Sequence, residues 1–141
     1  MTLKPAVSEV TRLNDWLEEA FAQGGTSASI ATGLKLCLNE IVANLISYAF
    51  KDTPDPQISI EVDLHADVAN AEVRDNGTYF DLRDWPEPSK PTDVLTAPIG
   101  GYGILLIRDR ASSITYERVD GMNRLRITCS EGTLDTARQA R

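Results

Sequence analysis

The stretch LCLNEIVANLISYAF, which occupies Leu36–Phe50, decides the fold because its apolar residues recur with the spacing of a helix. We expect that helix to begin at about Ser27, after an earlier amphipathic helix over residues 6–22. Apolar side chains cover a broad face of the second helix, whereas Glu40 and Asn44 project together from a narrow polar stripe. Such a stripe is either a solvated surface or one wall of a binding site.

Outside these helices, four segments alternate between apolar and polar residues, which is typical of strands. They are residues 57–64, 68–75, 113–119 and 124–129. Short links at residues 65–67 and 120–123 predict two antiparallel hairpins, separated by a helix over Tyr102–Arg110. The order α-α-β-β-loop-α-β-β predicts an α+β fold, a two-layer α/β sandwich. Its sheet, of four or more strands, is expected to be mostly antiparallel and covered on one face by helices.

Length and composition bound the class of protein. The 141 residues fit one domain, 1–141, with a core over about residues 6–130 and a polar tail over 131–141. No apolar run approaches the ~20 residues of a membrane helix, and the first residues lack a signal peptide's pattern, so we expect a cytoplasmic protein without a membrane partner. The net charge of −7 argues against direct binding of nucleic acid. Cys37 and Cys129 are expected to be reduced core residues.

Two glycine-containing segments accompany the helix that carries Glu40. Asp75-Asn76-Gly77 ends a predicted strand, and Gly100-Gly101-Tyr102-Gly103 opens a predicted helix. Each has an ordinary explanation, a tight turn for the first and a flexible loop for the second. Each also suits a nucleotide, because Asp75 can accept a hydrogen bond from the amine of adenine and glycines before a helix expose N–H groups to phosphate.

Between these glycine segments lies a stretch, residues 78–99, that is rich in proline and poor in periodic apolar residues. It contains Pro86, Pro88, Pro91 and Pro98. A loop of this length in a compact domain is usually functional or disordered. We expect it to be mobile without nucleotide and to cover a bound nucleotide as a lid.

Taken together, these segments resemble the anti-sigma regulatory factor and serine-kinase family. That family belongs to the superfamily of histidine-kinase-like ATPases, which includes gyrase and MutL. The segments that carry the resemblance are Leu38–Asn44 for its N box, Asp75–Asp81 for its first glycine box, Gly100–Arg108 for its second, and residues 116–118 and 123–125 for its last hairpin. The similarity covers about residues 6–130, with the boxes in order, and implies the Bergerat fold of these ATPases.

The resemblance implies a role for each matching residue. Glu40 would be the general base, and Asn44 the ligand of Mg²⁺. Asp75 would read adenine, with Gly77 beneath the base and Phe80 beside the nucleotide. The second glycine box would contact the phosphates of ATP through Gly100, Gly101, Tyr102 and Gly103. Family members hold a sigma factor inactive, phosphorylate a serine or threonine of an antagonist protein, and are often homodimers.

The sequence departs from the family pattern just before the second glycine box. Some kinase members carry a basic residue there, suited to the γ-phosphate, whereas this chain has Pro98-Ile99. Lys90 and Arg108 are candidate substitutes. The leading hypothesis is therefore an ATP-dependent protein-serine kinase in a partner switch. The alternatives are a non-catalytic nucleotide-binding interaction module, and a histidine-kinase catalytic domain cut from a longer chain.

Overall fold

A computed structural model describes residues 1–84 and 102–132 of the chain. The helical segments are α1 (Glu9–Gly24), α2 (Ala28–Asn44), the π-helical turn η1 (Leu45–Ala49), the 3₁₀ turn η2 (Leu82–Asp84) and α3 (Tyr102–Arg110). The strands are β1 (Thr2–Leu3), β2 (Ile58–Leu64), β3 (Val68–Asp75), β4 (Ser113–Val119) and β5 (Met122–Ser130). The expected glycines Gly100 and Gly101, most of the expected lid and the tail beyond residue 132 lie outside the described residues.

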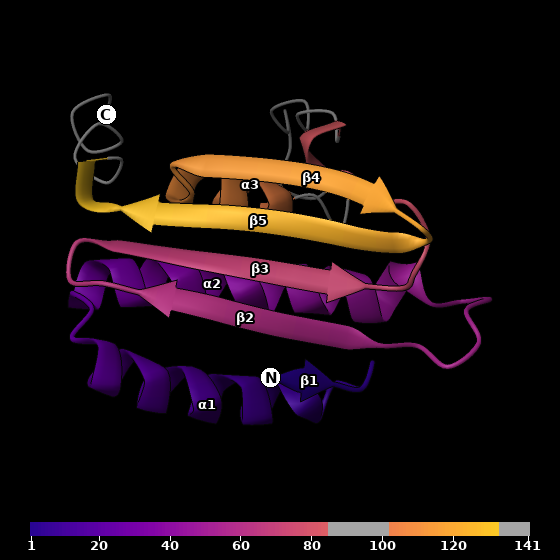
Figure 1. The fold of residues 1–141 in the computed structure, drawn as a ribbon, viewed down its shortest axis with the longest axis horizontal. Coiled ribbons are helices and arrows are strands. Elements are labelled where there is room, and N and C mark those ends of the chain that lie inside the picture. Colours follow the sequence, from indigo (N-terminus) through magenta and orange to yellow (C-terminus); the bar gives the residue numbers. More distant parts are fainter. Residues whose placement is uncertain (85–101, 133–141) are drawn as a thin grey trace, which may run out of the picture.

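The strands form one antiparallel sheet in the order β1-β2-β3-β5-β4, with α2 and α3 packed on one face (Figure 1). The predicted two-layer α+β architecture is confirmed. Sequence reasoning identified four strands and missed β1, because two residues cannot show an alternating pattern. Leu3 of β1 is nevertheless buried in the core, and the N–H of Ile60 donates to the carbonyl of Met1 at 2.8 Å.

Helix α1 packs through residues spaced four apart, Leu13, Leu17 and Phe21, which are buried on one face. It ends where Gly25 adopts a left-handed φ of 62°. The amides of Asn14 and Asn39 exchange hydrogen bonds of 3.2 and 2.7 Å between α1 and α2. These contacts fix α1 against the helix that carries Glu40 and Asn44.

The long helical run over residues 28–49 is the core helix of the domain. Its mean hydropathy of 1.3 and its length are enough for a membrane span by composition alone, contrary to the expectation that no run approaches that length. In this fold the apolar side chains of its inner face, including Ile30, Leu34, Leu38 and Val42, are fully buried against the sheet. Burial of these side chains in the core of the domain explains the same composition without a membrane.

Two local predictions need correction. The helical run ends at Ala49, one residue before the expected Phe50, and its last turn, η1, is π-helical. The N–H of Leu45 is shared between the carbonyls of Ile41 and Val42. The second hairpin turns through two residues, Asp120 and Gly121, instead of four. Both have positive φ, 52° and 77°, so the turn matches the twist of its strands and β5 begins at Met122.

Candidate nucleotide site

Asp75 lies at the end of β3 with only 4% of its surface exposed. Its Oδ1 accepts hydrogen bonds from the N–H of Gly77 and from Nδ2 of Asn123, both at 2.9 Å. Burial raises the pKa of the Asp75 carboxyl above its ordinary value, while these two bonds oppose the rise. A carboxylate held in this way is an oriented acceptor in an apolar wall.

Gly77 needs to be glycine because the chain passes very close to η1. A Cβ at this position would lie 2.7 Å from the carbonyl oxygen of Ala49 and 2.8 Å from its Cβ. Directly after it, the N–H of Thr78 donates to the same carbonyl at 2.9 Å. The turn after Asp75 is therefore fastened to the end of the helix that carries Asn44.

Asn44 and Asp75 line one cavity, together with Phe80, Leu82 and Tyr116. The space between these side chains is about 20 Å³, enough for about one water molecule. A purine base is larger than this space as the described residues enclose it. The structure thus brings three of the sequence-predicted residues, from α2, β3 and the segment after β3, to the same cavity.

Glu40 lies one helical turn before Asn44 on α2 and is half-buried. Its carboxylate lies against Gly103 at the start of α3, where an added Cβ would stand 3.1 Å from Cδ of Glu40 and would overlap Oε2. Gly103, the last glycine of the predicted second glycine box, therefore lies next to Glu40. Tyr102 is the first residue of α3.

Sequence reasoning missed the part played by Asn123. It quoted this residue only within the last hairpin, yet Asn123 pairs with Asp75 across β3 and β5 and is 2% exposed. A signal was present, because Asn123 begins an alternation with Leu125, Ile127 and Cys129, all buried. A polar residue on the buried face of a strand needs hydrogen-bond partners, and here one partner is the Asp75 carboxylate.

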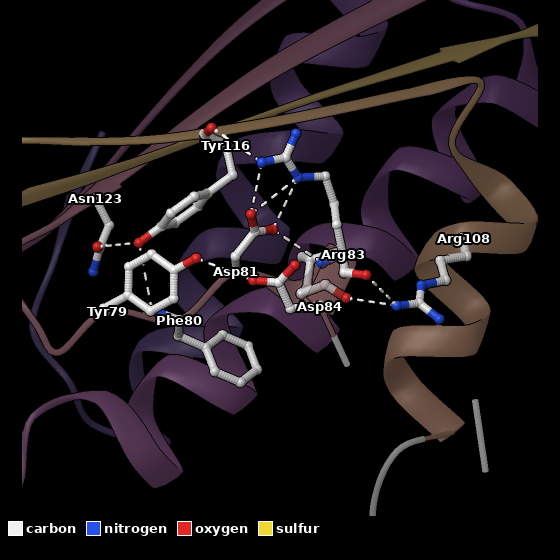
Figure 2. Close-up of polar contacts among 9 residues, drawn as sticks. Tyr79, Phe80, Asp81, Arg83, Asp84, Arg108, Tyr116 and Asn123 are labelled. Atoms are coloured by element: carbon white, nitrogen blue, oxygen red, sulfur yellow. Dashed lines mark hydrogen bonds and ion pairs between the residues drawn. The ribbon is translucent and has the colours of Figure 1, made fainter. Parts of the chain in front are cut away.

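The segment of residues 79–84, called here the strap, borders the cavity and is held by an internal ion pair and by contacts from β4 and α3 (Figure 2). Its own Asp81 and Arg83 form an ion pair of 2.6 Å, and the guanidinium holds the pKa of the Asp81 carboxyl below its ordinary value. From β4, the hydroxyl of Tyr116 accepts from the N–H of Phe80 at 3.4 Å. From α3, Nη2 of Arg108 donates to the carbonyls of Leu82 and Arg83 at 2.9 and 3.0 Å.

Arg108 is one of the two candidates to replace the basic residue that some kinases carry where this chain has Pro98-Ile99. Its guanidinium lies on backbone carbonyls of the strap, where it links α3 to the wall of the cavity. Lys90, the other candidate, lies outside the described residues.

The residues present fit a divalent cation that is only partly held by protein. Within residues 1–84 and 102–132, no group of three or more His, Cys, Asp or Glu side chains is placed to hold a metal. A cation beside the amide oxygen of Asn44 would take its other ligands from water and phosphate. Mg²⁺ binds in this manner in nucleotide sites.

Comparisons with known proteins agree with this geometry. Residues 3–129 match the histidine kinase-like ATPase domain. The serine/threonine-protein kinase BtrW of Bordetella bronchiseptica is 30% identical over 131 residues, 90% of this chain and 91% of BtrW. The serine-protein kinase RsbW of Listeria monocytogenes is 32% identical over 124 residues, 85% of this chain and 78% of RsbW.

A solved structure shares the fold at lower identity. The histidine kinase domain of the blue-light activated histidine kinase EL346 from Erythrobacter litoralis superposes with a TM-score of 0.56 and 14% identity. It covers 92% of this chain, which in turn spans 63% of that domain's chain.

Proposed function

This chain belongs to the histidine kinase-like ATPase family, with serine-protein kinases among its homologues, and we propose that it is an ATP-dependent protein serine/threonine kinase. In the partner switch implied by its resemblance to anti-sigma factors, it holds a sigma factor inactive and phosphorylates an antagonist protein. The proposal includes cytoplasmic residence and a possible homodimer.

One observation carries the proposal. A single helix, α2, presents Asn44 to the cavity that Asp75 lines and presents Glu40 to Gly103 of the second glycine box. The proposed base-reading acceptor, Asp75, thus lies beside the helix that carries both the proposed cation ligand, Asn44, and the proposed catalytic carboxylate, Glu40. Phosphoryl transfer depends mainly on such positioning and on neutralisation of charge.

The proposed roles follow from the chemistry of each side chain. Asp75 accepts a hydrogen bond from the amine of adenine, and Gly77 lets the backbone approach the base. Asn44 would hold Mg²⁺, which neutralises phosphate charge when bound. Glu40 accepts or orients the proton of the attacking serine or threonine hydroxyl. Gly100, Gly101 and Gly103 contact phosphate through the backbone, Tyr102 completes this box, and Phe80 borders the base.

The decisive test replaces Glu40 by glutamine, which keeps the shape of the side chain and removes its basicity. With labelled ATP, Mg²⁺ and a cognate antagonist protein, we expect phosphate transfer to fall about 10²- to 10⁴-fold. Titration calorimetry should show nearly unchanged affinity for ATP. Transfer at the wild-type rate in Glu40→Gln would remove Glu40 from the chemistry.

A second function is favoured by two observations. Arg108 lies on the strap carbonyls, and Pro98-Ile99 stands where some family kinases have a basic residue. A non-catalytic module that binds ATP to control a protein partner needs no such residue. Wild-type protein that binds ATP and the antagonist yet transfers no phosphate would support this alternative.

A further inference from the structure

The side-chain amide of Asn123 is held by partners on both of its ends. Its Oδ1 accepts from the hydroxyl of Tyr116 at 2.5 Å and from Nη1 of Arg118 at 2.6 Å. Its Nδ2 donates to Oδ1 of Asp75 and to the carbonyl of Thr78, both at 2.9 Å. We call Tyr116, Arg118 and Asn123 the amide lock.

The lock determines which end of the amide faces Asp75. A guanidinium only donates hydrogen bonds, so the atom of Asn123 that faces Arg118 must be the oxygen. The NH₂ group then faces Asp75, where a flipped amide would bring an oxygen against a carboxylate. Arg118 also donates to the carbonyl of Gly77 at 2.9 Å, which ties its guanidinium to the turn below the proposed base.

The two carboxylate oxygens of Asp75 differ in the hydrogen bonds that they accept. Within the described ranges 1–84 and 102–132, the recorded hydrogen bonds to this side chain both end on Oδ1 and none ends on Oδ2. Asp75 and Tyr116 both line the cavity. Oδ2 is therefore the acceptor that remains for a ligand that enters.

We propose that the amide lock is a specificity device: it positions Asp75 so that Oδ2 accepts from a ring amine and rejects a ring carbonyl at the same place. Arg118 and Asn123 act through Asp75 and are positioning residues, whereas Tyr116 both positions Asn123 and lines the cavity. This inference rests on the proposed binding of nucleotide in the cavity. It adds to that proposal the residues that select adenine over a 6-oxopurine.

Charge supports the same assignment. Burial raises the pKa of Asp75, and the bond from Asn123 opposes that rise. The groups that face Asp75 are Asn123 from β5 and Arg118 and Tyr116 from β4. If the amide of Asn123 is free to turn, it stabilises the carboxylate of Asp75 less, so Asp75 takes up a proton more readily. A protonated Asp75 carboxyl can donate a hydrogen bond to a ring carbonyl, which the carboxylate cannot do. Loss of the lock should therefore weaken the discrimination more than it weakens binding itself.

The test compares ATP with inosine triphosphate, which has a carbonyl in place of the adenine amine. Titration calorimetry with Mg²⁺ would measure both affinities for wild type and for the double variant Tyr116→Phe/Arg118→Met. The phenylalanine keeps the ring that packs edge-on against Tyr79, with centroids 5.3 Å apart, and Arg118 is exposed, so the variant should fold. We expect the ratio of the two affinities, which favours ATP in wild type, to fall about fivefold to tenfold.

Matched variants separate the lock from general effects. Arg118→Lys keeps a donor-only cation and should retain most of the ratio when Tyr116 is intact. Arg126→Met removes another arginine from the same sheet, away from the cavity, and should leave the ratio unchanged. An unchanged ratio in the double variant would overturn the lock alone. A wild type that binds neither nucleotide would overturn the proposed function, and the lock with it.

Discussion

Asp75 combines burial with the charge that its proposed role requires. Because burial raises its pKa above the ordinary 3.8, the folded protein holds this proton more tightly than the unfolded chain does. The stability that Asp75 contributes is then fully present below that ordinary value and is lost as pH rises through the folded pKa. At neutral pH the carboxylate therefore opposes folding while it serves recognition, as functional groups often do.

Asp75→Asn should separate these two effects. The asparagine is neutral at every pH and still accepts from the N–H of Gly77. We expect its unfolding free energy, relative to wild type, to rise as pH increases from about 4 to 7. Its affinity for ATP should fall about tenfold or more, because an acceptor is lost.

Urea unfolding at several pH values and calorimetry with ATP would measure both quantities. Asp52→Asn, at an exposed carboxylate, is the matched control and should change neither. A relative stability of Asp75→Asn that declines between pH 4 and 7 would contradict the assignment.

At the scale of elements, α2 and α3 approach each other where Gly103 meets Glu40. An alanine there would overlap the end of a flexible side chain, so Glu40 can turn away without a shift of backbone. We expect Gly103→Ala to fold with near wild-type stability, since alanine also favours the helix by about 1 kcal/mol. Phosphate transfer should nevertheless drop about tenfold or more, because Glu40 is displaced.

Gly33→Ala is the matched control for this prediction. Gly33 lies within α2, and outside its own helix backbone no atom of residues 1–84 and 102–132 lies within 4 Å of an added Cβ. Thermal unfolding should show that this variant is more stable than wild type by about 0.5–1 kcal/mol. Transfer by Gly33→Ala should be unchanged. Phosphate transfer at the wild-type rate by Gly103→Ala would show that transfer does not depend on the present position of the Glu40 carboxylate.

At the scale of the whole molecule, a nucleotide would join α2, β3 and α3, and its binding should stabilise the complete domain. With ATP and Mg²⁺ at about 100 times the dissociation constant, linkage adds about 2.7 kcal/mol. For a domain of this size that corresponds to a rise in Tm of roughly 5–10 °C. Scanning calorimetry would measure the rise. At the same ligand concentration, a roughly tenfold weaker affinity in Asp75→Asn should leave about half of it or less, since linkage then adds about 1.4 kcal/mol. An equal rise in that variant would place the nucleotide elsewhere.

The fold was predictable because each of its long elements carries its own periodic pattern. Helix α2 shows a broad apolar face over several turns, and β2 and β3 alternate over seven and eight residues. Helix α3 begins and ends at the predicted residues, Tyr102 and Arg110. Features that depend on few residues were missed or misjudged. These include the short strand β1, the π-helical turn η1 and the two-residue turn at Asp120 and Gly121.

The sequence by itself determined the fold class and the candidates for chemistry, because helical spacing puts Glu40 and Asn44 on one face and the glycine boxes are contiguous. Only the tertiary structure decided that Asn123 holds Asp75, that Gly103 lies against Glu40, and that Arg108 lies on the strap. Asn123 and Asp75 are 48 residues apart in the chain, and they meet because β3 pairs with β5. Contacts of this kind depend on strand order and on close packing between layers, which a local pattern does not encode.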